Sequence, residues 1–209
     1  MISYAGPDCL VSMVVLHFCG QLTIIRRSLK NLVDGVTKSD PKKYWKKIAA
    51  IVTRHEQIND LAIVIRMTFS SILLVQMLAC SLTFCFQAYT MFTTLMDRDG
   101  GETLPLFELG FSMIYAVYTV IHLFIYCYVG DRLSVESTSL ADDFYETEWY
   151  TLSSKEAKAF LLICQRSRVP LEIKAGKFCT FNLQLFNAIL KNSMGYLSML
   201  IAMKQRLIE

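Results

Sequence analysis

Charged residues are scarce in this sequence. Of its 209 residues, 19% are Asp, Glu, Lys or Arg and 54% are hydrophobic, whereas a soluble domain has about 25% charged residues. The apolar residues are gathered in long blocks, and neither an internal repeat nor a low-complexity segment interrupts them. The composition therefore favours a membrane protein over a soluble globular one.

Signatures of enzymatic chemistry are also missing. The sequence contains no GxxxxGK[ST], GxGxxG, HExxH or GxSxG motif. Its 7 cysteines include no CxxC pair and no Cys/His ligand spacing, which argues against a zinc site or a disulfide framework. We therefore expect no enzyme, no cofactor and no metal site. The net charge of +3 is mild, and we expect no nucleic-acid partner.

Long stretches without charge predict membrane spans. Residues 67–96 and 109–130 contain no charged residue, and as helices rising about 1.5 Å per residue both are long enough to cross a bilayer. Residues 178–203 are interrupted only by Lys191. Residues 9–25 are uncharged but reach only the lower length limit for a span.

Basic residues set the orientation of these spans. The polar segments 26–66 and 131–177 are rich in Lys and Arg, whereas Arg98 is the single base within 97–108. The positive-inside rule places the two basic segments in the cytoplasm. The predicted order is a partial span at 1–25, a cytoplasmic segment at 26–66, a span at 67–96, an extracellular loop at 97–108, a span at 109–130, a cytoplasmic segment at 131–177, a span at 178–203 and an extracellular tail at 204–209.

The cytoplasmic segments have helical periodicity of their own. Asp40-Pro41 predicts a helix start, and apolar residues from Tyr44 to Ile65 follow at three- and four-residue spacing into the second span. A second amphipathic helix is predicted from Lys155 to Arg168, and Pro170 ends it. Their apolar faces are covered by each other or by a neighbouring subunit, or alternatively by lipid headgroups.

Two residues inside the predicted spans have competing interpretations. His122 is either a relay or ligand group or, as is more usual, a hydrogen-bond donor to a neighbouring helix. Lys191 either extends its amine to the inner interface or borders an aqueous path.

The order of several short motifs resembles the insect odorant receptor family. The motifs are His55-Glu56-Gln57, Tyr126-Cys127-Tyr128-Val129-Gly130, Glu136-Ser137, Ala141, Tyr145, Trp149-Tyr150, Arg166-Ser167-Arg168-Val169-Pro170, Ala175-Gly176-Lys177-Phe178, Phe186, Ile189-Leu190-Lys191 and Ser193-Met194-Gly195-Tyr196. The resemblance implies an all-α, polytopic transmembrane protein: a partial copy of a seven-helix receptor-channel with cytoplasmic anchor helices. The spans correspond to the family's fourth to seventh helices, and we expect an N-terminally truncated member.

The resemblance also implies a function. Members of the family are odorant-gated, non-selective cation channels of the plasma membrane of olfactory sensory neurons, and they assemble as tetramers that contain a shared co-receptor. The expected partners are therefore this co-receptor, a small volatile ligand and the lipid bilayer. The residues implied for assembly are Tyr145, Trp149, Pro170, Gly176 and Phe178.

Pore and ligand residues follow from the same resemblance. The last helix would line the pore with Gly195, Met199 and Met203, which share one face and fall where the family places its apolar gate. Ser often stands at the position of Gly195 in the family. The outer half of the family's sixth helix would contact odorant through Phe111, Tyr115 and Tyr118. For both sets, packing on neighbouring helices is the alternative.

Other functional classes remain open. The chain would also suit a non-conducting membrane scaffold, or a pseudogene product that only assembles. A relative of the gustatory receptors has a similar architecture, although the segment with Tyr145 and Trp149 favours the odorant receptors. A transporter is disfavoured because the spans are not paired and broken by Gly or Pro.

Overall fold

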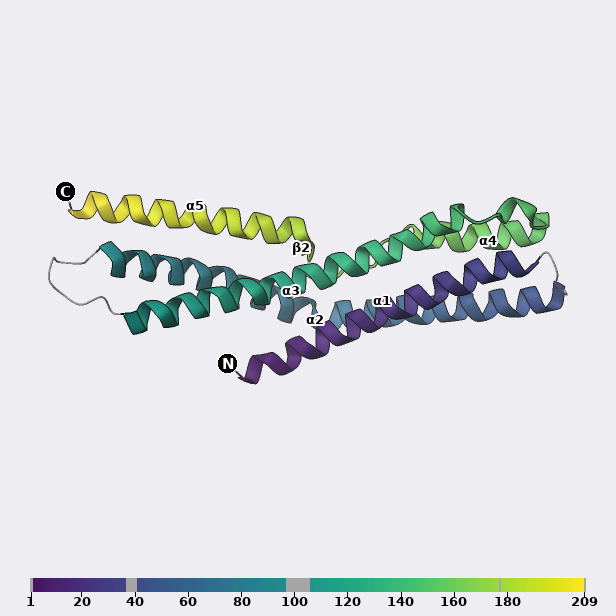
Figure 1. The fold of residues 1–209 in the computed structure, drawn as a ribbon, viewed down its shortest axis with the longest axis horizontal. Coiled ribbons are helices and arrows are strands. Elements are labelled where there is room, and N and C mark those ends of the chain that lie inside the picture. Colours follow the sequence, from purple (N-terminus) through teal and green to yellow (C-terminus); the bar gives the residue numbers. More distant parts are fainter. Residues whose placement is uncertain (1, 37–40, 97–105, 177, 209) are drawn as a thin grey trace. The chain divides into compact units, whose positions relative to one another are not determined.

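The computed structural model is built from long helices, and it describes residues 2–36, 41–96, 106–176 and 178–208. In chain order the elements are α1 (Ile2–Val36), α2 (Pro41–Met96), α3 (Leu106–Tyr145), the 3-10 turn η1 (Trp149–Thr151), α4 (Ser154–Ser167), the strands β1 (Lys174–Ala175) and β2 (Cys179–Thr180), and α5 (Leu183–Ile208) (Figure 1). The all-α prediction is confirmed. Most of the predicted extracellular loop, residues 97–105, lies outside the described residues.

Local sequence explains where three of the helices begin. The predicted helix that continues into the second span is confirmed, because α2 starts at Pro41 and runs without a break to Met96. At the start of α4, Ser153 and Glu156 form a capping box, in which the backbone N–H of Ser153 donates to Glu156 Oε2 at 3.1 Å. At the start of α5, the N–H of Leu185 donates to Asn182 Oδ1 at 2.7 Å.

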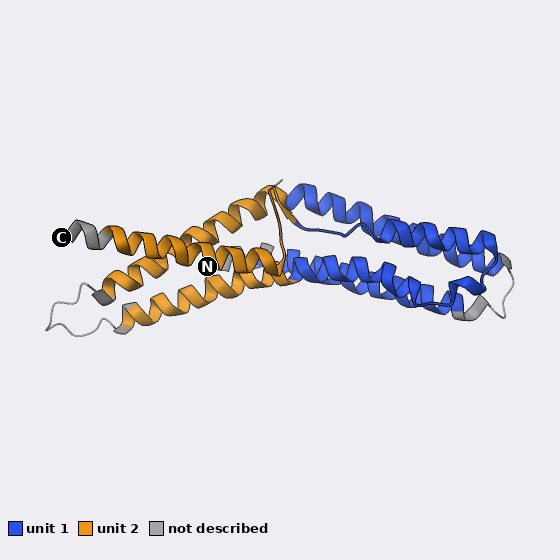
Figure 2. Ribbon diagram, turned by 90° about the horizontal axis from the view of Figure 1, so that it is seen from above, with its two compact units in different colours: residues 1–69, 129–173 blue, residues 70–128, 174–209 orange. Residues whose placement is uncertain are grey.

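The chain divides into two compact units (Figure 2). Unit 1 contains residues 1–69 and 129–173, which include α1, α4, the first part of α2 and the last part of α3. Unit 2 contains residues 70–128 and 174–209, which include the remaining parts of α2 and α3, the β1–β2 hairpin and α5.

Unit 1 has a core of its own. The Phe144 ring of α3 meets the Phe160 ring of α4 edge-on at 4.4 Å between centroids, and Phe160 is fully buried. The predicted stripe of α2 is buried at Tyr44, Ile48 and Ile58, and the Tyr44 hydroxyl donates to the carbonyl oxygen of Glu156 at 3.3 Å. The first part of α2 and α4, the two predicted amphipathic helices, therefore contact each other, and each covers part of the other's apolar face.

A seam on α1 extends well beyond the predicted partial span. Its buried residues alternate in steps of four and three, as in a coiled coil: Val11, Val15, Phe18, Leu22, Ile25, Leu29 and Leu32. This repeat continues past the first basic residues, Arg26 and Arg27, so α1 is one continuous packed helix in unit 1.

Within the residues that the structure describes, three helices are long and apolar enough to cross a membrane: Cys9–Val33, Lys42–Thr94 and Leu109–Tyr145. In the most apolar window of α2 only 6% of the residues are buried by the described chain, as expected of a helix whose apolar side chains face lipid or other membrane helices. Among the described residues α5 does not reach the same hydropathy, because Asn187, Lys191 and Asn192 lower its average. That α5 is the last span stays a prediction.

Candidate functional site

Four aromatic rings follow one face of α3 in unit 2. Tyr115 stacks on Tyr118 with 6.5 Å between ring centroids, Tyr118 stacks on His122 at 5.9 Å, and His122 meets Tyr126 edge-on at 5.3 Å. Spacings of three and four residues place these rings above one another on a helix. Tyr115 is half-buried and Tyr118 is 41% exposed. The predicted ligand residues Tyr115 and Tyr118 thus belong to one aromatic strip.

His122 connects this strip to α2. Its Nδ1 lies 3.6 Å from Cys80 Sγ, and the Gln76 side chain donates to the same sulfur at 3.9 Å. Cys80 is buried against α3. The contact supports the structural interpretation of His122, a polar link between two membrane helices.

Phe111 lies one turn before Tyr115 on α3, in the wall of a cavity of about 320 Å³ between α2 and α3. The side-chain amide of Gln87 on α2 donates to the carbonyl oxygen of Ser112 on α3 at 3.2 Å and also to the Ser112 hydroxyl. Of the predicted ligand residues, Phe111 is among the described residues that line this cavity, whereas Tyr115 and Tyr118 are not. Gln87 and Ser112 were not predicted, since only the pairing of α2 with α3 brings them together.

The predicted pore residues lie on an open face of α5. Met199 is 62% exposed and Met203 is 51% exposed. A Cβ atom built on Gly195 would meet no described atom within 4 Å. The described part of the chain does not cover this face, which leaves lipid, water or another subunit as its neighbour.

Four of the five predicted assembly residues are also accessible. Phe178 is 83% exposed, Tyr145 is 66% exposed, Pro170 is exposed and Trp149 is half-buried, with its ring 6.1 Å from that of Tyr145. Gly176 differs from them because it forms the turn of the β1–β2 hairpin with a φ of 62°.

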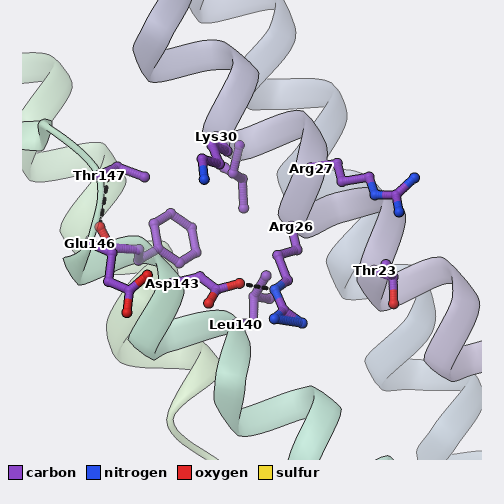
Figure 3. Close-up of a pocket in the computed structure, with 10 residues that line it drawn as sticks. Thr23, Arg26, Arg27, Lys30, Leu140, Asp143, Glu146 and Thr147 are labelled. Atoms are coloured by element: carbon purple, nitrogen blue, oxygen red, sulfur yellow. Dashed lines mark hydrogen bonds and ion pairs between the residues drawn. The ribbon is translucent and has the colours of Figure 1, made fainter.

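An ionic cluster joins α1 to α3 in unit 1 (Figure 3). The Arg26 guanidinium contacts Glu136 at 3.2 Å and also pairs with Asp143, and Arg132 contacts Glu136 at 3.2 Å. A cavity of about 450 Å³ opens beside Arg26, and Lys30, one turn on along α1, and Thr147, on the facing segment, also line it (Figure 3). No sequence motif marks this cluster, because Arg26 lies 110 positions before Glu136 in the chain.

Burial in unit 1 suppresses the ionised forms of three groups. The pKa of the His55 imidazole lies below its ordinary 6.5, because the ring is buried and Arg166 is nearby. Desolvation raises the pKa of the Cys164 thiol to about 12 and that of the Tyr44 hydroxyl to about 12. The three groups are therefore neutral at pH 7, and the Cys164 thiol and the Tyr44 hydroxyl are unsuited to act as nucleophiles. Among the described residues no three His, Cys, Asp or Glu side chains are placed to hold a metal ion.

Sequence comparison finds one family across nearly the whole chain. The family model described as 7tm odorant receptor matches residues 1–194. The odorant receptor coreceptor of Aedes aegypti is 31% identical over 173 residues, which cover 82% of this chain and 34% of that protein. Odorant receptor 22c of Drosophila melanogaster is 25% identical over 193 residues, covering 88% of this chain and 46% of that protein. The chain thus spans a third to a half of the length of these relatives.

The fold matches a solved receptor. The insect olfactory receptor OR5 from Machilis hrabei, in complex with eugenol, superposes with a TM-score of 0.79. The match covers 94% of this chain and 48% of that receptor at 16% sequence identity, so it shows a shared fold. This shared fold, the family match and the membrane-spanning helices together support one assignment. The chain is a multi-pass membrane protein and belongs to the insect odorant receptor family.

Proposed function

We propose that this chain acts as an odorant receptor subunit that joins a co-receptor in the plasma membrane of an olfactory sensory neuron. In that assembly it would be one subunit of a tetramer that conducts cations without selectivity when odorant binds. The family match over residues 1–194 carries the proposal. The sequence similarity to coreceptors from several insects supports the same kind of assembly.

Gating is assigned to the open face of α5. Met199 and Met203 lie one turn apart, and in a ring of subunits such thioether side chains would form an apolar constriction that closes by losing its water. Odorant bound against Tyr115 and Tyr118 would favour the open state if it bound that state more tightly.

Co-expression with an insect odorant receptor coreceptor tests conduction. We expect odorant-evoked cation current at the cell surface, and we expect Met199→Gln to raise the basal current because an amide wets the constriction. Met194→Gln is the matched control, since Met194 is equally exposed on another face of α5. Normal surface assembly without current would instead favour a non-conducting scaffold.

A further inference from the structure

The cavity between α1 and the end of α3 has side chains of both charges in its wall. It lies within unit 1 and has a volume of about 450 Å³, which falls in the size range of small-molecule sites. Its charged residues are three bases of α1 and two acids at the end of α3 and just after it: Arg26, Arg27, Lys30, Asp143 and Glu146. We propose that this cavity binds a small zwitterion with a phosphate group and a primary ammonium group, as in phosphoethanolamine.

Arg26 is held in place by the protein but keeps donors for a ligand. Its Nε group pairs with Asp143 and its Nη1 group donates to Glu136, and Figure 3 shows the contact with Asp143 at the edge of the cavity. The Arg26 Nη2 group forms no hydrogen bond within the described chain. Because a guanidinium has five N–H donors in a fixed plane, a fastened Arg26 can still donate to an anion in the cavity.

Lys30 and Glu146 line the same cavity without pairing. Neither forms an ion pair with any residue that the structure describes, so their charged groups are too far apart for direct contact. Lys30 also lies one turn after Arg26 on α1, and like charges at that spacing repel each other. An anionic group between Lys30 and Arg26 would remove this repulsion, and a cationic group beside Glu146 would balance its carboxylate.

This arrangement favours a zwitterion over a simple ion. A lone anion would be repelled by Glu146, and a lone cation by Lys30 and Arg26. A phosphate group has enough acceptor oxygens to bind Lys30 and Arg26 at the same time. A primary ammonium has three donors for Glu146, whereas the trimethylated ammonium of choline has none. Ethanolamine is therefore the better cationic end of the ligand.

Two sources can supply this chemistry on the cytoplasmic side of the membrane. The predicted cytoplasmic segment begins at Arg26, directly after the uncharged residues 9–25. Soluble phosphoethanolamine and the headgroup of phosphatidylethanolamine carry the same phosphate and the same primary ammonium. Binding at this cavity requires neither odorant nor conduction, so the inference does not depend on the proposed function.

Calorimetric titration of the full chain in phosphatidylcholine nanodiscs tests the site. We expect O-phosphoethanolamine to bind several-fold more tightly than inorganic phosphate, ethanolamine or phosphocholine. No binding of O-phosphoethanolamine, or equal affinity for inorganic phosphate, would overturn the proposal. Nanodiscs that contain phosphatidylethanolamine then distinguish the two sources. A weaker signal for the soluble probe in them would show that the lipid headgroup occupies the cavity, and an unchanged signal would assign the cavity to the soluble molecule.

Two pairs of variants locate the recognition groups. Lys30→Gln and Glu146→Gln should each weaken the binding of O-phosphoethanolamine several-fold. Both side chains are exposed and make no ion pair in the described chain, so we expect both variants to fold. Lys43→Gln and Glu148→Gln are the matched controls, because both residues are exposed and neither lines the cavity.

Glu146→Gln carries the sharper test. Without the carboxylate the ammonium loses its partner, so this variant should no longer prefer O-phosphoethanolamine over inorganic phosphate. A preference that persists in Glu146→Gln, or unchanged affinity in Lys30→Gln, would refute the assignment. A silent channel with intact binding would count against the proposed function alone.

Discussion

Ser70 and Gly176 exchange two hydrogen bonds although 106 positions separate them in the chain. The backbone N–H of Gly176 donates to the Ser70 carbonyl oxygen at 3.0 Å, and the Ser70 hydroxyl donates to the Gly176 carbonyl oxygen at 3.1 Å. The pair fastens the hairpin that precedes α5 onto α2 within unit 2. Because Ser70 is part of a helix, its hydroxyl and carbonyl are held in place for the turn.

Replacing Gly176 should loosen this attachment. Its φ of 62° is unfavourable for a residue with a Cβ, and an added Cβ would lie 3.2 Å from Leu74 Cδ2. We expect Gly176→Ala to lower the free energy of unfolding by about 1–2 kcal/mol, measured by thermal denaturation in detergent. Gly20→Ala is the control, because a Cβ there meets no described atom within 4 Å and a helical Ala is favourable. Equal stability of the two variants would contradict the role given to Gly176.

The Arg26 cluster should contribute more than an ordinary surface ion pair. Arg26 contacts both Glu136, which is 13% exposed, and Asp143. Arg26→Gln would leave a mostly buried carboxylate with fewer cationic partners, and we expect a loss of about 1–2 kcal/mol in stability. Arg27→Gln, at the exposed neighbouring position, should cost little. The difference in stability between the two variants should shrink in high salt, since salt screens ion pairs. A difference that does not change with salt would indicate a loss of packing contacts instead.

The Phe144–Phe160 contact should dominate the core of unit 1. Phe160 has no exposed surface and its ring lies 4.4 Å from that of Phe144. Phe160→Ala would open a cavity, and we expect it to lower the unfolding free energy by about 3–5 kcal/mol. Leu162→Ala serves as the comparison two positions along α4, where the side chain is 67% exposed. Limited proteolysis of the 129–173 region would report the loss, and similar protection in both variants would argue against this core.

Acidification should destabilise unit 1 through His55. Burial holds the pKa of His55 below 6.5 in the folded state, with Arg166 of α4 acting in the same direction and Glu56 opposing it. The unfolded chain therefore binds the proton more readily, so the contribution of the neutral ring is fully present above pH 6.5. It is lost as the pH falls from there toward the lower folded pKa.

Thermal denaturation between pH 7.5 and 5 measures this effect. The wild-type protein should lose stability over that range, and His55→Gln should lose less. The Asn59 amide, whose Nδ2 lies 3.4 Å from the ring Nδ1, is retained in that variant. Identical pH profiles for the two proteins would show that His55 does not carry the dependence.

The sequence by itself determined the membrane class and much of the local structure. The long uncharged runs predict membrane-spanning helices. Pro41 begins α2, and Pro170 follows the end of α4. The apolar stripe of α2 is buried at Tyr44, Ile48 and Ile58, as its spacing predicts. The motif order also identified the family. These features are readable because they depend on neighbours within a few turns of the chain.

Only the tertiary structure decided which distant residues meet. It paired Arg26 with Glu136, brought Gln87 to Ser112, and placed Phe111 in the wall of the cavity that these two residues also line. Helical periodicity reports which face of a helix is apolar, but the rotation and register of one helix against another follow from how all their side chains pack together. Contacts of that kind leave no signature in a single segment of sequence.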